Sequence, residues 1–312
     1  MTKTEQSIQS LSVVIPLYRE SRHLGDTLWK IIRILDDLGI KYEVILVDDG
    51  SPDETWQAIL TLCKRYSTVY GIRLSRNFGK EAAIAAGLEC AGGRAVILMD
   101  GDLQHPPAMI PEMVEHWRAG ADVVEAVKRL RGEESWSSRI RAKIFNTIFA
   151  YLSGYDLRGA SDFKLMDHRV LHAWRSMGER NLFFRGMSAW LGFKRVQIQF
   201  DVQERIDGKS NWTLVQLVRL TITAITSFSS APLHLVTLTG IVFTCFAIIL
   251  GIQTLYLKFS GNAIDGFTTV ILLLLVIGAV VMLGLGIIGT YIARIYEKVK
   301  ARPRFIVAER TE

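Results

Sequence analysis

Short apolar runs alternate with amphipathic stretches along the chain from Leu11 to about Val127. The apolar runs are bounded by turn residues, which is typical of the buried strands of a parallel sheet. Strand–helix alternation at this spacing predicts such a sheet, covered by helices on both faces and connected by right-handed crossovers. The expected strands are 11–16, 42–47, 69–74, 95–99 and 123–126, and the expected helices are 21–38, 53–66, 79–91 and 106–119.

The pattern is less regular between residues 135 and 205. Residues 140–152 predict a helix that carries several aromatic side chains, and residues 193–200 alternate enough to predict another strand. The polar segment Ser161-Asp162-Phe163-Lys164 lies between the two.

Two long apolar segments follow, at residues 232–257 and 267–293. Each exceeds the ~20 residues that are needed to cross a bilayer, and the link between them is too short to be a domain. Lysine and arginine crowd the far end, so the positive-inside rule places both ends of this hairpin in the cytoplasm. Two buried helices of a soluble core are the alternative. Gly284, Gly286 and Gly289 would permit close helix contact.

Residues 211–230 precede the hairpin and carry apolar side chains at roughly helical spacing. Periodicity alone does not separate a plain core helix from an interfacial helix on the membrane. The position next to a membrane span favours the interfacial helix.

Composition supports this division of the 312-residue chain. It is 49% hydrophobic and 22% charged, and the apolar excess is concentrated after residue 230. The formal charge of +6 suits an anionic membrane or substrate, and no aromatic-interleaved basic patch indicates nucleic acid. Cys63, Cys90 and Cys245 lack metal-ligand spacing and are expected to be small buried side chains in a reducing compartment. Residues 1–9 lack the apolar core of a signal peptide, so the first domain is expected in the cytosol.

The segment Asp100-Gly101-Asp102-Leu103-Gln104-His105 directly follows the apolar run 95–99. Ligands of open α/β sheets bind at the carboxyl ends of such strands. Two carboxylates one residue apart can hold a hard divalent cation, and such cations are commonly shared with substrate phosphates. Capping of the next helix by Asp100 and Asp102 is the alternative. The segment alone leaves both interpretations open.

Three further segments place polar side chains after expected strands. Residues 12–20 end in a turn with proline, and residues 44–51 end in Asp48 and Asp49. Asp49 could accept hydrogen bonds from a base or ribose, although turn and capping chemistry explains either segment by itself. Residues 73–81 bring arginine and lysine close to a helix N-terminus, which suits a diphosphate, and solvated surface charge is the alternative.

Taken together and in this order, the segments resemble the family-2 glycosyltransferases with a GT-A fold, and specifically the polyprenyl-phosphate glycosyltransferases. The chain looks like the bactoprenol (undecaprenyl-phosphate) glucosyltransferase branch that is associated with O-antigen glucosylation. The resemblance covers nearly the whole chain, and its specificity lies in the ordered set followed by the paired apolar segments. The matching segments are 14–20, 47–51, 76–81, 100–105, 161–166 and 205–210.

The resemblance implies an α/β fold, with a Rossmann-like cytosolic GT-A domain and a C-terminal two-helix transmembrane hairpin. It also assigns roles at the nucleotide-sugar site. Asp100 and Asp102 face the ribose, the diphosphate and a metal, Mg²⁺ or Mn²⁺, with Asp102 preferred as the direct ligand. The other residues implied at this site are Pro16, Tyr18, Glu20, Asp49 and Gln104.

The resemblance gives the lipid phosphate a set of candidate partners. Relatives often carry lysine directly after the serine of the last motif, whereas here Asn211 follows Ser210. This departure puts in doubt which cation reaches the phosphate, and Lys209 is a substitute. The candidates are Arg129, Arg131, Arg205, Lys209 and Ser210.

The expected reaction is inverting transfer of a hexose from a nucleotide sugar, UDP-glucose in this branch, to polyprenyl phosphate. The metal on Asp102 and the cation of Lys80 would neutralise the departing diphosphate. Asp162 occupies the position of a proposed general base. A phosphate monoester has its second pKa near ~6 and is largely ionised already, so Asp162 has two alternative roles: holding sugar hydroxyls or positioning the arginines.

The expected domains are a GT-A domain at 1–210, a juxtamembrane helix at 211–230, a hairpin at 231–293 and a basic cytoplasmic tail at 294–312. Relatives suggest a homo-tetramer. Mannose from GDP-mannose and an aminoarabinose donor stay open. A processive synthase usually has more spans and a Gln-x-x-Arg-Trp element, which the sequence lacks. A non-enzymatic nucleotide sensor would leave Asp162 and residues 205–210 without a role.

Overall fold

The computed structural model describes residues 10–101, 105–128, 161–177, 184, 190–200, 231–260 and 266–311. The chain divides into two compact units. The first comprises Met1–Leu217 and Pro303–Glu312, and the second comprises Val218–Arg302.

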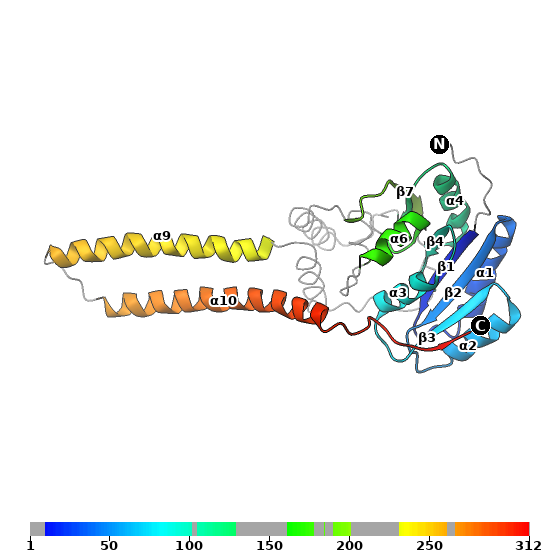
Figure 1. The fold of residues 1–312 in the computed structure, drawn as a ribbon, viewed down its shortest axis with the longest axis horizontal. Helices are drawn as coiled ribbons and strands as arrows, with labels where there is room; N and C mark the ends of the chain where they lie inside the picture. Colours follow the sequence, from blue (N-terminus) through cyan, green and yellow to red (C-terminus); the bar gives the residue numbers. More distant parts are fainter. Residues whose placement is uncertain are drawn as a thin grey trace. The chain divides into compact units, whose positions relative to one another are not determined.

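The described part of the first unit contains one eight-stranded sheet in the order β7-β5-β6-β4-β1-β2-β3-β8 (Figure 1). The five expected strands and the sixth at 193–200 are all present, with ends that shift by up to two residues. The strands are β1 (Ser10–Leu17), β2 (Lys41–Asp48), β3 (Val69–Leu74), β4 (Ala95–Leu98), β5 (Val123–Lys128), β6 (Lys164–Asp167), β7 (Arg195–Phe200) and β8 (Val307–Arg310).

The sheet is mixed, which corrects the expectation of a parallel sheet. β1 pairs in parallel with β2 and β4, and β2 and β3 and also β5 and β7 are parallel pairs. β6 runs antiparallel to both β4 and β5, and β8 runs antiparallel to β3. The sequence pattern misses β6 because the charged residues Lys164 and Asp167 enclose only two apolar ones, and it misses β8 because three of its four residues are exposed.

Helices cover both faces of the sheet, as predicted (Figure 1). Alternate β1 side chains such as Val13 and Ile15 join a buried cluster with α1, α2 and α4. On the other face, Gly87 of α3 lies against Val14 of β1, where a larger residue would collide. The helices are α1 (Leu24–Asp37), α2 (Thr55–Arg65), α3 (Lys80–Cys90), the 3₁₀ turn η1 (Pro107–Met109), α4 (Ile110–Arg118) and α6 (His168–Ser176).

The order of the strands fixes the place for a ligand. β2 follows on one side of β1 and β4 lies on the other, so the connections leave β1 and β4 in opposite directions. Ligands of open α/β sheets bind at such a switch point, beyond the carboxyl ends of the strands. The ends of β1, β2 and β4 carry the segments that the sequence singled out.

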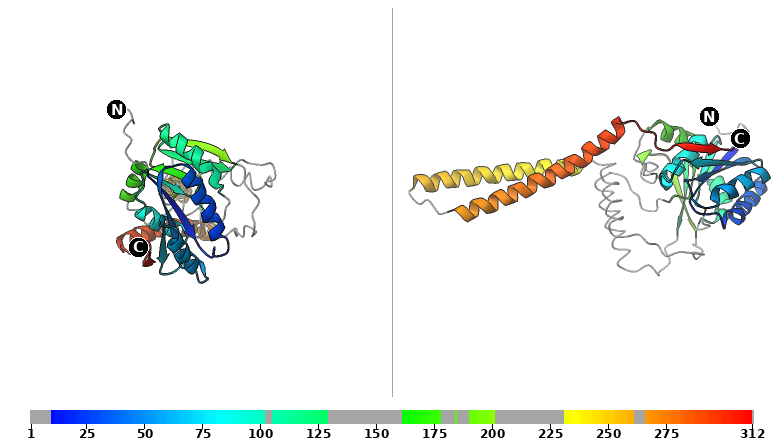
Figure 2. Two further views of the ribbon diagram at one scale, coloured as in Figure 1. Left: turned by 90° about the vertical axis from the view of Figure 1, so that its right-hand side faces the viewer. Right: turned by 90° about the horizontal axis from the view of Figure 1, so that it is seen from below.

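The C-terminal residues differ from the expected basic tail. β8 lies at the edge of the sheet, antiparallel to β3, with Glu309 opposite Arg73 (Figure 2, red). Thr311 anchors the end of this strand, because its hydroxyl accepts a hydrogen bond from the Gly71 N–H at 2.7 Å. Pairing with an unsatisfied sheet edge outweighs the charge and hydrophilicity of this segment.

The second unit contains α9 (Ala231–Phe259) and α10 (Phe267–Val299), which contact one another. Gly284 of α10 is buried, and a Cβ atom there would lie 3.2 Å from Val236, so one of the three predicted small-residue contacts is present. Gly286 and Gly289 have open space around them. Among the described residues, Val276–Ala293 is long and apolar enough to cross a membrane, and crossing by α9 stays a prediction.

Some expectations lie on residues that the structure does not describe. These are the helices at 140–152 and 211–230 and the charged segments around Arg129 and Lys209. The three cysteines are unpaired, but they are not the buried side chains we expected. Cys63 and Cys90 are half-buried and Cys245 is exposed.

Candidate active site

A cavity of about 320 Å³ opens at the carboxyl ends of β1, β2 and β4. The N-terminal turn of α3 closes one side of it, and the helix N-terminus favours anionic groups there. The lining residues are Pro16, Leu17, Tyr18, Glu20, Asp49, Asn77, Gly79, Lys80, Ala83, Asp100 and Gly101.

Asp49 holds two loops of this cavity together. One carboxylate oxygen accepts the Phe78 N–H at 2.8 Å and the other accepts the Gly79 N–H at 2.9 Å. Its own N–H donates to the Leu17 carbonyl at 2.9 Å, which ties the end of β2 to the end of β1. The resemblance implies that Asp49 faces the base of the nucleotide. The structure adds a second role, because both carboxylate oxygens accept hydrogen bonds from the backbone of the loop before α3.

Gly50 allows the same two loops to approach. Its φ of +63° lies in the left-handed region, and a Cβ atom there would lie only 2.7 Å from the Cα atom of Arg76. Glycine has no Cβ atom and adopts this conformation readily. The turn after β2 and the loop before α3 therefore meet backbone to backbone.

The neighbouring carboxylates Asp48 and Asp49 are buried, and burial raises the pKa of both. Hydrogen bonds from Ser51 and the charge of Arg73 lower the pKa of Asp48 in part, and the backbone N–H groups of Phe78 and Gly79 do the same for Asp49. In each case the desolvation of the charged form is the larger effect. Their hydrogen bonds, and the charge of Arg73 for Asp48, therefore offset part of the cost of burying these two carboxylates.

Lys80, the first residue of α3, contacts two carboxylates that are far apart in the sequence but lie beside the neighbouring strands β4 and β6. Its Nζ lies 2.6 Å from Asp100 Oδ1 and 3.1 Å from Asp162 Oδ2. Burial alone would lower the pKa of Lys80, but the charges of Asp100 and Asp162 outweigh it, so the pKa is raised. The ammonium therefore stays protonated at neutral pH beside the space where an anionic group would lie.

His105 supports the turn that carries Asp100. Its Nδ1 accepts the Asp100 N–H at 3.0 Å, so Nδ1 carries no proton and the 3.8 Å approach to the Asp100 carboxylate is not an ion pair. The ring is buried and stacks on Phe163, with centroids 5.0 Å apart. His105 therefore fixes the backbone of this turn through a neutral ring.

The turn after β1 forms another side of the cavity. Arg19 has a φ of +60°, which is uncommon for a residue with a side chain. Its N–H donates to the Ser51 hydroxyl at 3.0 Å, and the next N–H, of Glu20, donates to Thr55 Oγ1 at 3.1 Å. These two bonds hold the backbone that presents Tyr18 and Glu20 to the cavity.

Comparison with known proteins identifies the family. The sequence profile of glycosyl transferase family 2 matches residues 12–177. An uncharacterized glycosyltransferase of Synechocystis sp. is 36% identical, covering 96% of this chain and 95% of that protein. This chain belongs to glycosyl transferase family 2. It is a glycosyltransferase.

Other relatives of the glycosyltransferase carry more specific names. A prophage bactoprenol glucosyl transferase homolog of Escherichia coli is 34% identical over 95% of this chain and 98% of its own length. The bactoprenol glucosyl transferase of Shigella phage SfX is 33% identical over 96% and 99%.

Solved structures support the fold. Glucosyl-3-phosphoglycerate synthase from Mycobacterium tuberculosis, solved with Mg²⁺ and UDP, has a TM-score of 0.50 at 18% identity, covering 70% of this chain and 77% of that one. The glycosyltransferase therefore has the GT-A fold that its motifs imply.

The predicted nucleotide-sugar residues of the glycosyltransferase gather at one place where the structure describes them. Pro16, Tyr18, Glu20, Asp49, Lys80 and Asp100 all line the cavity. Asp162 forms an ion pair with Lys80, which lines the cavity. Asp102 and Gln104 and the five lipid-phosphate candidates, Arg129, Arg131, Arg205, Lys209 and Ser210, lie outside the described residues.

Sequence reasoning did not single out several contributors to the site, including Leu17, Gly79 and Gly101 of the cavity lining. Asn77 and Ala83 line the cavity, and His105 supports the Asp100 turn. Asn77 and His105 belong to the segments that carried the resemblance, so their position was a signal, but no chemistry distinguished them. Ala83 follows from the helical period, because it lies one turn after Lys80.

The described residues fit a divalent metal in part. Asp100 supplies a carboxylate at the cavity, the kind of ligand that Mg²⁺ and Mn²⁺ prefer. Its Oδ1 is paired with Lys80, and the described ranges contain no group of three metal-ligating side chains. A metal at this position therefore needs ligands beyond Asp100, from the segment 102–104 or from a bound diphosphate.

Proposed function

We propose that this glycosyltransferase moves a hexose, glucose from UDP-glucose, to a polyprenyl phosphate with inversion at the anomeric carbon. The observation that carries the proposal is the cavity in which Lys80 meets Asp100 and Asp162, at the switch point of the sheet. The relatives named as bactoprenol glucosyl transferases supply the acceptor class, since they match nearly the whole chain.

The donor pocket is assigned from its shape and charge. Asp49 and the loop it holds lie at the end of β2, the side we assign to the base and ribose. Lys80 and the N-terminus of α3 lie where the diphosphate is proposed to bind. A fixed cation and a helix N-terminus both stabilise the negative charge that develops on a leaving diphosphate.

A bound Mg²⁺ or Mn²⁺ would supply further charge neutralisation at the leaving diphosphate. Asp100 and Asp102 would hold it, with Gln104 beside the sugar. Asp100 would then be shared between the metal and Lys80. The two positive charges would act on the same leaving group.

The acceptor is expected to attack with little help from a protein base. A phosphate monoester is largely ionised at neutral pH, because its second pKa is about 6. Asp162 is paired with Lys80 at 3.1 Å, which suits a residue that positions the cation. We therefore assign Asp162 to holding Lys80 in place, in preference to general-base catalysis.

The membrane part brings the pocket to its acceptor. Moving a polyprenyl chain out of the bilayer costs about 0.8 kcal/mol for each exposed CH₂ group, so the site has to work at the membrane surface. Val276–Ala293 of α10 has the length and composition of a membrane span. We propose that α9 pairs with it as a hairpin, with the catalytic unit on the cytoplasmic side.

The lipid phosphate is proposed to meet basic residues near the membrane. The candidates are Arg129, Arg131, Arg205, Lys209 and Ser210. The resemblance also suggests that the protein is a tetramer.

The test uses purified full-length protein in bilayer nanodiscs that contain undecaprenyl phosphate. UDP-glucose, UDP-galactose, GDP-mannose and UDP-4-amino-4-deoxyarabinose are supplied separately, each with Mg²⁺ or Mn²⁺, and lipid products are separated by chromatography. A lipid-linked single glucose supports the proposal. A lipid product from another donor only would correct the sugar, and a polymer would indicate a processive synthase. No product with any donor would contradict transfer to polyprenyl phosphate.

A further inference from the structure

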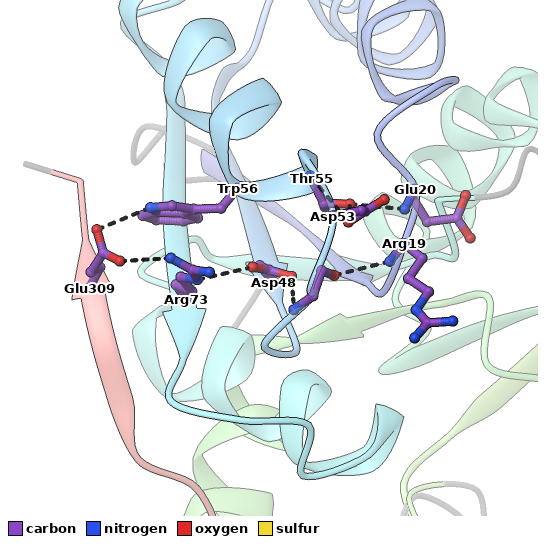
Figure 3. A network of polar contacts seen from close by, with 9 residues as sticks. Arg19, Glu20, Asp48, Asp53, Thr55, Trp56, Arg73 and Glu309 are labelled. Carbon is purple, nitrogen blue, oxygen red and sulfur yellow. Dashed lines mark hydrogen bonds and ion pairs between the residues drawn. The ribbon is translucent and has the colours of Figure 1, made fainter.

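A chain of polar contacts runs from the C-terminal strand β8 to the turn that carries Tyr18 and Glu20 (Figure 3). It begins at Glu309, whose two carboxylate oxygens are both in use. Oε1 accepts from Arg73 Nη1 at 3.0 Å, and Oε2 accepts from Trp56 Nε1 at 3.1 Å. Glu309 therefore fixes the guanidinium of Arg73 from the outside of the sheet.

Arg73 also contacts Asp48, which lies deeper in the protein. Arg73 Nε lies 3.5 Å from Asp48 Oδ2, an oxygen that is fully buried and accepts no hydrogen bond. The charge of Arg73 is thus the compensation that this oxygen has in the folded protein. A buried carboxylate without a partner is costly, so the position of Arg73 bears directly on Asp48.

Asp48 holds Ser51 in place by a hydrogen bond, and Ser51 in turn holds the backbone at the edge of the cavity. Asp48 Oδ1 accepts the Ser51 N–H at 2.9 Å, and the Ser51 hydroxyl accepts the Arg19 N–H at 3.0 Å. Arg19 is the residue with the unusual φ of +60°. A backbone in a sparsely populated region persists only where its surroundings determine it, and Ser51 is such a determinant.

We infer that Glu309 is a positioning residue for the donor pocket, acting through Arg73, Asp48 and Ser51 on the backbone at Arg19. The identification of the pocket as a donor site rests on the proposed function. The contact chain itself rests on the residues alone. It gives the segment that follows the last apolar helix a part in donor binding, although no β8 residue lines the cavity.

The variants are Glu309→Gln, Arg73→Gln and the double variant. Gln keeps the size of Glu309 but removes its charge, so it preserves the strand. Arg310→Gln is the matched control, because Arg310 is the exposed neighbour on β8 and strand alternation directs it to the other face of the sheet.

Two readouts are taken on full-length protein. The first is hydrogen–deuterium exchange of the peptide that contains Arg19 and Glu20, with β5 as an internal reference for folding. The second is the donor KM for UDP-glucose, compared with kcat and with the KM for lipid phosphate. A general loss of stability would change β5 as well, whereas a positioning effect is confined to the turn and to donor KM.

We expect Glu309→Gln to speed exchange at Arg19 and to raise donor KM roughly fivefold to tenfold, the size of couplings within one hydrogen-bond network. In the Arg73→Gln background, Glu309→Gln should add nothing, and Arg310→Gln should match the wild type. Unchanged exchange at Arg19, or full additivity of the two substitutions, would overturn the inference. Wild-type protein that transfers no sugar would contradict the proposed function, and exchange at Arg19 would still decide whether the contact chain acts.

Discussion

The Lys80 ammonium lies 3.1 Å from the Asp162 carboxylate, although the two residues are 82 positions apart in the sequence. Lys80 begins α3, and Asp162 comes two residues before β6. The antiparallel pairing of β6 with β4 brings Asp162 back to the same edge of the sheet as Asp100. The strand that departs from the parallel pattern therefore completes the site.

Lys80 is expected to act on the leaving group. We predict that Lys80→Met lowers kcat by roughly 10²–10³-fold, as the loss of one electrostatic stabiliser typically does. Because the raised pKa of Lys80 keeps it charged, its contribution should not decline between pH 7 and 9. Initial rates over this pH range, measured for wild type and Lys80→Met, test both statements.

Asp162→Asn separates a positioning carboxylate from a general base. Loss of a general base typically costs roughly 10²–10⁴-fold, whereas we expect a loss below about tenfold, since the acceptor phosphate is already ionised. Single-turnover rates measure this directly. A loss of several orders of magnitude, with donor binding intact, would return Asp162 to the role of base.

Gly50 and Gly39 form a matched pair of glycines. Both have a positive φ, near +60°, but only at Gly50 would a Cβ atom collide with backbone, that of Arg76. Gly39→Ala should cost about 1–2 kcal/mol of stability through conformation alone and leave donor binding unchanged. Gly50→Ala should also separate the two pocket loops and abolish donor binding, measured by titration with UDP. Normal UDP binding by Gly50→Ala would contradict the account of these loops.

Lys164 and Glu125 form a fully buried ion pair at 3.0 Å, and Lys164 Nζ also lies 4.9 Å from the centre of the Phe184 ring. The second oxygen of Glu125 accepts no hydrogen bond and has only a longer ion-pair contact, 4.0 Å from Arg195 Nη1. Lys164→Met alone should cost about 3–5 kcal/mol because it leaves a buried charge, whereas Lys164→Met with Glu125→Met should be close to neutral. Chemical unfolding of both variants measures the difference, and equal losses would show that the charge is not the cause.

Asp167 gives a stability contribution with a defined pH dependence. Burial would raise its pKa, but hydrogen bonds from Trp117 and Arg169 outweigh this and lower it. Its contribution is therefore present above its ordinary pKa of about 4 and is lost as pH falls through the lower folded value. Asp167→Asn should lower stability by about 1–3 kcal/mol at neutral pH, and the difference from wild type should shrink toward pH 3.

Thermal unfolding across this pH range checks the Asp167 prediction. Glu115→Gln is the control, because Glu115 is exposed in the middle of α4. A difference that stays constant down to pH 3 would mean that the charge of Asp167 is not involved.

Much of the catalytic unit could be predicted from its hydrophobic pattern. β1 is long and β4 consists of apolar residues alone, so both stand out, whereas the four buried residues of β6 include Lys164 and Asp167 and do not. β8 has no such pattern, since three of its four residues are exposed, and its pairing partner β3 lies more than 230 residues away. Long-range pairing of this kind is decided by an available sheet edge, which local sequence does not record.

The position of the candidate site could be predicted because the carboxyl ends of parallel strands lie at one edge of the sheet. Asp49 and Asp100 were expected at one edge and lie in one cavity. Their partners were less predictable. Asp49 accepts hydrogen bonds from two backbone N–H groups, and Lys80 forms ion pairs with two carboxylates. Both sets of contacts depend on how the loops fold against one another. Such contacts follow from backbone geometry that residue types alone leave open.

We propose that the site beside Lys80 catalyses the transfer of glucose from UDP-glucose to a membrane-bound polyprenyl phosphate. The most direct measurement is the formation of lipid-linked glucose by the full-length protein in nanodiscs with undecaprenyl phosphate, for wild type and Lys80→Met side by side. We expect a single-sugar lipid product with the wild type and roughly 10²–10³-fold slower formation of that product with Lys80→Met. A variant as active as the wild type, or a wild type that forms no lipid-linked sugar, would contradict this proposal.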